Sequence, residues 1–99
     1  SQRFERLLSF CVVSAVDSCK IELKDIKLLE KAMDKISFSI SNSLRMRDVY
    51  TRYSRSQYLL LLLDADKSSF DGIEERIMTR FRRSKTMDSV NVKFDFKEI

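Results

Sequence analysis

The chain has few of the residue types that carry out chemistry, and this narrows the possible functions. Its 99 residues include no histidine and two cysteines. The lack of histidine excludes Ser-His-Asp triads, Cys-His dyads and histidine-containing zinc sites, and two cysteines cannot build a four-cysteine zinc site. Cys11 lies in an apolar run, so we expect a buried core thiol rather than a disulfide with Cys19.

Two groups of charged side chains could suggest a binding site. Asp64 and Asp66 follow an apolar run, and a loop explains this acidic pair better than a metal site does. The densest basic cluster follows a predicted helix and consists of Arg80, Arg82, Arg83 and Lys85. Positive charge suits the C-terminal end of a helix dipole, so the cluster needs no nucleic-acid partner. The net charge of +4 is compatible with phosphate-bearing ligands but is also that of an ordinary protein surface.

Length and composition predict one domain that spans residues 1–99. Hydrophobic residues make up 43% of the chain, which is enough for a single core. No apolar stretch approaches the roughly 20 residues that a membrane-spanning helix needs, and no secretory signal is visible. We therefore expect a cytoplasmic protein that does not insert into a membrane.

Hydrophobic periodicity predicts four strands. Residues 7–16 and 58–63 are apolar on both faces, which is typical of buried strands. Residues 49–53 and 90–96 alternate between apolar and polar side chains, which is typical of half-buried strands.

Two amphipathic helices separate these strands. Apolar residues recur every three or four positions within residues 24–45 and again within residues 70–81. Ser68 followed by Asp71 resembles a capping box at the start of the second helix.

The resulting order is βαββαβ, an α+β arrangement of the ferredoxin-like type. It forms a four-stranded antiparallel sheet with both helices on one face. The doubly apolar first and third strands suit the central positions, and the alternating second and fourth strands suit the edges. The other face of the sheet is left for a missing segment or a partner to cover.

The segment from Met33 to Leu63 resembles the GGDEF (diguanylate cyclase) family. The residues at matching places are Leu44, Arg45, Asp48, Arg52, Tyr53 and Tyr58. The match continues without a gap into the next helix, where Glu75-Arg76-Ile77 resembles the family's Glu-Arg-Ile. The family's opening Asp-x-Leu-Thr-x-Leu segment and its last helix-strand unit are absent. The resemblance thus implies one truncated GGDEF-like domain, part of or excised from a larger bacterial signalling protein.

The signature hairpin departs from the family pattern, which implies a degenerate member. Family enzymes condense two GTP molecules into cyclic di-GMP with metal held by acids of the first strand and the hairpin. The five hairpin positions here are Ser54, Arg55, Ser56, Gln57 and Tyr58, with neither glycine nor acid. The ungapped match also places Val13 and Ala15 where the family has the aspartate of the first strand. We therefore expect no cyclase activity, no catalytic residues, no bound metal and no cofactor.

A second family feature is better preserved. Many GGDEF domains bind cyclic di-GMP at an inhibitory site formed by an Arg-x-x-Asp motif and an arginine of the next helix. Arg45, Asp48 and Arg76 occupy these places, and arginine pairs well with phosphate and guanine. The alternative is that Asp48 simply fixes the turn into the second strand.

Three functions remain open at this point. The first is a non-catalytic regulatory domain that binds cyclic di-GMP and signals to a neighbouring domain. The second is a ligand-free module for dimerisation or protein interaction, and the third is an unrelated ferredoxin-like sensor of a small ligand. RNA binding is disfavoured, because the third strand, YLLLLL, lacks the basic and glycine residues that accompany the aromatics of RNA-recognition motifs.

Overall fold

The elements follow one another in the predicted βαββαβ order. A computed structural model describes residues 7–83 and 88–99 of the chain. Its elements are β1 (Leu8–Val16), α1 (Ile26–Ser41), β2 (Val49–Ser54), β3 (Gln57–Leu63), α2 (Lys67–Phe81) and β4 (Asn91–Glu98). No helix within residues 7–83 or 88–99 is long and apolar enough to cross a membrane.

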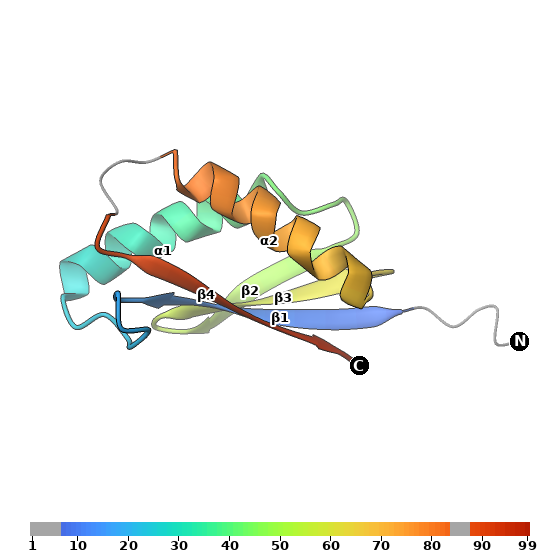
Figure 1. The fold of residues 1–99 in the computed structure, drawn as a ribbon, viewed down its shortest axis with the longest axis horizontal. Coiled ribbons are helices and arrows are strands. Elements are labelled where there is room, and N and C mark those ends of the chain that lie inside the picture. The colour runs from blue at the N-terminus through green and yellow to red at the C-terminus, as the bar shows by residue number, and fades with distance from the viewer. Residues whose placement is uncertain (1–6, 84–87) are drawn as a thin grey trace, which may run out of the picture.

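The four strands form one antiparallel sheet in the order β2-β3-β1-β4. The two doubly apolar strands, β1 and β3, are central, and β2 and β4 are the edges, as predicted. Figure 1 shows both helices on the same face of this sheet. The prediction of an α+β, ferredoxin-like fold is confirmed.

The core lies between the helices and this face of the sheet. Alternate residues of β1 and β3, such as Cys11, Val13, Leu60 and Leu62, are fully buried there. The helices contribute the stripes that the sequence predicts, with the buried residues Leu29, Met33, Ile36, Ile40, Ile73, Ile77 and Phe81. The helices therefore stay in place mainly through apolar burial.

The opposite face of the sheet carries an apolar strip. Phe10 pairs with Leu61 and Leu61 pairs with Val49, so these three side chains share one face. Val49 is 55% and Leu61 is 38% exposed, and among the described residues no helix covers them (Figure 1). We name Phe10, Val12, Val49, Leu59 and Leu61 the outer strip.

The start of α2 differs from the prediction. Ser68 is not the N-cap, since the helix begins at Lys67 and Asp66 caps it. The Asp66 carboxylate accepts hydrogen bonds from the backbone N–H (3.0 Å) and the hydroxyl of Ser68. A carboxylate accepts more strongly than a hydroxyl, and these bonds from Ser68 lower the pKa of Asp66. The prediction that Asp66 serves a local role in the loop, rather than in a metal site, fits this geometry.

The end of α1 also comes earlier than predicted. The helix stops at Ser41, so Arg45 lies in the segment that follows it. The side chain of Asn42 donates to the carbonyl of Phe38 (2.8 Å), and that of Ser43 donates to Ser39 (2.7 Å). These side chains occupy the last carbonyls of the helix and end it without a glycine.

Candidate functional site

Asp48 makes the hydrogen bonds that hold the segment joining α1 to β2. Its side chain is 1% exposed, and its carboxylate accepts hydrogen bonds from two places. Arg45 donates its backbone N–H (3.1 Å), Nε (3.0 Å) and a terminal nitrogen (3.3 Å). The backbone N–H of Leu63, at the end of β3, is the fourth donor (3.1 Å). The carboxylate is therefore committed to holding the segment against the sheet.

Arg45 is the solvent-facing half of this pair. Its guanidinium also donates to the carbonyl of Leu63 (2.8 Å), so it bridges the acid and the strand end. The side chain nevertheless remains 46% exposed. Asp48 thus fixes the orientation of a guanidinium group that solvent can still reach.

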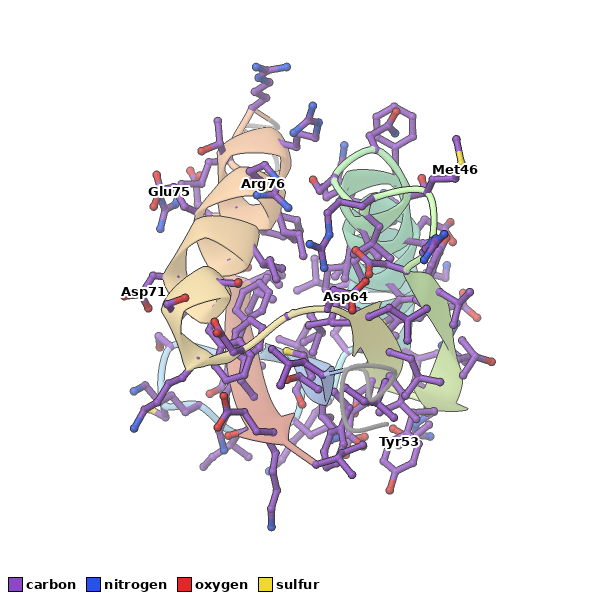
Figure 2. All side chains as sticks on the ribbon, turned by 90° about the vertical axis from the view of Figure 1, so that its right-hand side faces the viewer. Met46, Tyr53, Asp64, Asp71, Glu75 and Arg76 are labelled. Atoms are coloured by element: carbon purple, nitrogen blue, oxygen red, sulfur yellow. The ribbon has the colours of Figure 1, made fainter. Side chains whose placement is uncertain are left out.

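Two arginines of α2 contact the same segment at Ser43. Arg76 donates Nε to the Ser43 carbonyl (3.4 Å), and Arg80, one helical turn later, donates to the Ser43 hydroxyl (3.4 Å). Figure 2 shows Arg76 on the side of α2 that faces this segment, while Asp71 and Glu75 project from its other side. The fold therefore brings Arg76 to the segment that carries Arg45 and Asp48, although residues 43 and 76 lie far apart in sequence.

Asp64 lies at the same end of the sheet, directly after β3. Its backbone is in the left-handed region (φ 59°), and its N–H donates to the carbonyl of Leu7 (2.7 Å). This turn closes the end of β3 against the start of β1. In Figure 2 Asp64 lies between α2 and the segment that carries Met46, which points away into solvent. Met46 is 100% exposed.

The signature hairpin, at the opposite end of β2 and β3, is held by its own polar groups. Ser54 Oγ donates to Gln57 Oε1 (2.8 Å), and the N–H of Ser56 donates to Ser54 Oγ (3.3 Å). Gln57 also donates to Ser14 Oγ on β1 (3.0 Å). Ser56, at the place of a family acid, is 7% exposed. These hydrogen bonds join the hairpin residues to one another and to β1.

Arg52 and Tyr58 make further contacts that hold the hairpin. Arg52 donates to the carbonyls of Ser54 (2.7 Å) and Arg55 (2.7 Å), and its guanidinium lies 5.4 Å from the ring centre of Tyr58. The Tyr58 hydroxyl donates to the carbonyl of Met33 on α1 (3.1 Å). Tyr58 is therefore a core residue that ties the hairpin to the helix layer.

The acids near the hairpin are engaged locally. Glu22 forms an ion pair with Arg55 (3.2 Å). Asp17 accepts from the backbone of Cys19 (2.8 Å) and Ile21 (3.0 Å), which closes the turn after β1. Within residues 7–83 and 88–99, no group of three or more His, Cys, Asp or Glu side chains is arranged to hold a metal ion.

The first-strand positions of the family match lie in the core. Val13 and Ala15, where the family carries a metal-binding aspartate, are fully buried. Of the basic cluster, Arg80 lies in the last turn of α2, as the dipole argument expects. Lys85 lies outside the described residues.

The sequence did not point to Ser43 and Arg80 as residues that lie close to the segment carrying Arg45. Ser43 takes part through a backbone carbonyl and a hydroxyl, neither of which a residue pattern identifies. Arg80 had a signal, since it lies four residues after Arg76 and shares its helix face.

The fold is that of solved diguanylate cyclases and GGDEF domains. It matches a diguanylate cyclase (DGC) protein from Thermotoga maritima with a TM-score of 0.72 and 20% identity, over 94% of this chain and 64% of that one. The diguanylate cyclase SiaD of Pseudomonas aeruginosa, solved with its activator SiaC, gives 0.71 and 15%, over 94% and 38%. A P. aeruginosa structure that comprises only the GGDEF domain gives 0.64 and 15%, over 98% and 60%.

These matches show which fold the chain has and how much of each solved structure it covers. The chain spans less than two thirds of each of those three structures. No protein-family model matches the sequence, and no curated protein matches it. At this level of identity, the GGDEF-like fold is what the comparison shows, and activity and ligands belong to the proposal that follows.

Proposed function

We propose that this chain is a non-catalytic regulatory domain of GGDEF type that binds cyclic di-GMP through Arg45 and Arg76. The observation that carries the proposal is that Arg76, from α2, contacts the same short segment in which Arg45 is oriented by Asp48. The GGDEF-like fold and the Arg-x-x-Asp spacing support the same reading. Binding of the ligand would then be signalled to a neighbouring domain.

The proposal gives different roles to the three predicted site residues. Asp48 is buried, so its role is to position Arg45 rather than to contact the ligand. An arginine held in place loses little side-chain entropy on binding, and its planar group can pair with a phosphate. Arg76 would exchange its long contact with the Ser43 carbonyl for the charged phosphate, which is the stronger acceptor.

Calorimetry with cyclic di-GMP tests this proposal. We expect measurable binding by the wild-type chain and binding weakened about tenfold by Arg76→Gln, since a charged hydrogen bond is lost. Arg82→Gln is the matched control, because Arg82 is exposed just beyond the end of α2 and should leave affinity unchanged. No heat at high micromolar cyclic di-GMP would overturn the proposal.

The non-catalytic part of the proposal rests on the hairpin and the first strand. Ser56 and Gln57 replace the acids, and Val13 and Ala15 are core residues. We expect no cyclic di-GMP from GTP and Mg²⁺, and none from the double variant Ser56→Asp/Gln57→Glu, because the first-strand acid is still missing. Product formation by the wild-type chain would contradict this expectation.

A second candidate function is an interaction module, favoured by the outer strip. Exposed apolar side chains that adjoin one another on a sheet face are typical of contact surfaces. Sedimentation would reveal self-association, which Val49→Lys should weaken because it places a charge on the strip. Ile26→Lys is the control, since Ile26 is similarly exposed (58%) on the helix layer. A wild-type monomer at all concentrations would reject self-association by this face.

A further inference from the structure

The two edge strands of the sheet differ in how well they resist pairing with another chain. An edge strand exposes a row of backbone N–H and C=O groups, and charged side chains along it usually keep a second strand away. β4 has four charged residues among its eight, which are Lys93, Asp95, Lys97 and Glu98. β2 has one charged residue among its six, which is Arg52. The β2 edge is therefore the less protected of the two.

The single charge of β2 does not guard its open edge. Arg52 donates to the carbonyls of Ser54 and Arg55 (both 2.7 Å) and lies over the ring of Tyr58, its partner on β3. The guanidinium group thus lies over the hairpin and the neighbouring strand rather than beyond the edge. Among the described residues β2 pairs with β3 alone, and five of its six residues are exposed. Its backbone offers the unpaired groups to which a second strand binds.

The residues of β2 are complementary to a second copy of the same strand. In an antiparallel pair centred on Thr51, Thr51 faces its own copy and Tyr50 faces Arg52 on either side. The next pair outward joins Val49 to Tyr53. Threonine pairs and pairs of an aromatic with a β-branched residue are favourable across strands, and an arginine can lie against a tyrosine ring. A pair centred on Arg52 would instead oppose two guanidinium groups, so the centre at Thr51 is preferred.

The same pairing would place the outer strips of two copies side by side. Val49 and Thr51 lie on the outer face of the sheet, since their partners on β3 are Leu61 and Leu59. Figure 2 shows Tyr53 projecting on the side of the sheet away from the helices. Val49 is 55% and Tyr53 is 59% exposed, although both are large apolar residues. Contact between them across the pair would remove part of this apolar surface from water.

We propose that two copies of the chain associate by antiparallel pairing of their β2 edges, with a two-fold axis at Thr51. Two-fold symmetry is the commonest in homo-oligomers, and it makes the residue on the axis face itself. The paired segment is short, so the dimer should be weak and should form at high protein concentration. The inference rests on the second candidate function, the interaction module, for which it names the partner and the surface. It does not depend on cyclic di-GMP binding.

Sedimentation equilibrium of the 99-residue chain tests the pairing through the residue on the axis. We expect the wild-type chain to self-associate, and Thr51→Lys and Thr51→Glu each to weaken association about tenfold or more, because like charges would meet. An equimolar mixture of the two variants should associate again, because opposite charges would meet at the axis. Asp95→Asn is the matched control. It raises the net charge by the same amount as Thr51→Lys, at an exposed residue of the other edge strand, and should change association by less than about twofold.

Amide hydrogen exchange separates edge pairing from face-to-face packing of the outer strips. Edge pairing should slow the exchange of those β2 amides that point away from β3 as the protein concentration rises, and should leave the β4 amides unchanged. Face-to-face packing would cover side chains and leave the backbone of the β2 edge open to water. Exchange in β2 that is independent of concentration would overturn the inference, as would a mixture of the two Thr51 variants that stays monomeric. Either result would leave cyclic di-GMP binding by Arg45 and Arg76 standing, since calorimetry measures it separately.

Discussion

Asp48 and Arg45 form an ion pair of 3.0 Å in which the acid is almost fully buried and the base is half exposed. The pair closes a tight turn, because the Asp48 N–H also donates to the Arg45 carbonyl (3.1 Å). The two other donors to the carboxylate are backbone groups of Arg45 and Leu63. The spacing of the Arg-x-x-Asp motif is thus the spacing that this turn requires.

Replacing Asp48 by alanine should destabilise the chain by about 2–4 kcal/mol. The change leaves the N–H of Leu63 without its acceptor at a partly buried position and removes the partner of Arg45. Urea denaturation, followed by circular dichroism, measures the loss as a lower midpoint with an unchanged slope. Arg47→Ala is the control, because Arg47 is exposed in the same segment and should change stability by less than about 0.5 kcal/mol. Equal losses for the two variants would show that the Asp48 network contributes little.

The sequence predicts the fold well because burial dictates its residue pattern. β1 and β3 are apolar on both faces, and in the structure they occupy the two central positions of the sheet. The helix ends were less predictable, since they depend on single hydrogen bonds. Ser43 ends α1 through its hydroxyl, and Asp66 rather than Ser68 caps α2. Neither hydrogen bond alters the apolar periodicity from which helices are predicted, so that periodicity does not reveal where the helix ends lie.

The candidate site was predictable in position but not in geometry. The motif pointed to Arg45 and Asp48, and the helix match pointed to Arg76. The burial of Asp48 depends on the end of β3, whose Leu63 N–H comes 15 residues later. Contacts between residues far apart in the chain depend on tertiary packing, and the pattern of residues in a single sequence does not reveal them.

Tyr58, at the place of the final hairpin residue, should matter for stability. Its ring is 7% exposed and packs edge-on against Tyr50, with ring centres 5.6 Å apart. Tyr58→Ala should cost about 3–5 kcal/mol through the cavity it leaves, and Tyr58→Phe about 0.5–1.5 kcal/mol through the lost bond to Met33. Thermal unfolding measures both. Tyr53→Ala is the control, because Tyr53 is 59% exposed and should change stability far less.

The two thiols should react at very different rates. Burial raises the pKa of the Cys11 thiol to about 12, and its side chain is inaccessible, whereas Cys19 is exposed. The thiolate is the reactive form, so at about pH 8 we expect one thiol to react rapidly with an aromatic disulfide reagent and the second to react after unfolding in guanidinium. Cys19→Ser should abolish the rapid phase. A rapid phase that persists in this variant would contradict the burial of Cys11.

The cap of α2 should make stability depend on acid pH through Asp66. Hydrogen bonds from the Ser68 hydroxyl and backbone lower the pKa of Asp66 below its unfolded value of 3.8. A carboxyl whose pKa is lower in the folded state stabilises the fold above its unfolded pKa, and this contribution disappears as the pH falls through the folded pKa. We therefore expect Asp66→Ala to lower the melting temperature at neutral pH and to have a smaller effect in acid, once the pH has fallen through the lowered pKa of Asp66. Glu75→Ala, an exposed acid in the middle of the same helix, is the control and should show no such pH-dependent difference. Melting curves that shift equally for Asp66→Ala at both pH values would show that the cap works through the neutral acid, and the assigned role of its charge would then be wrong.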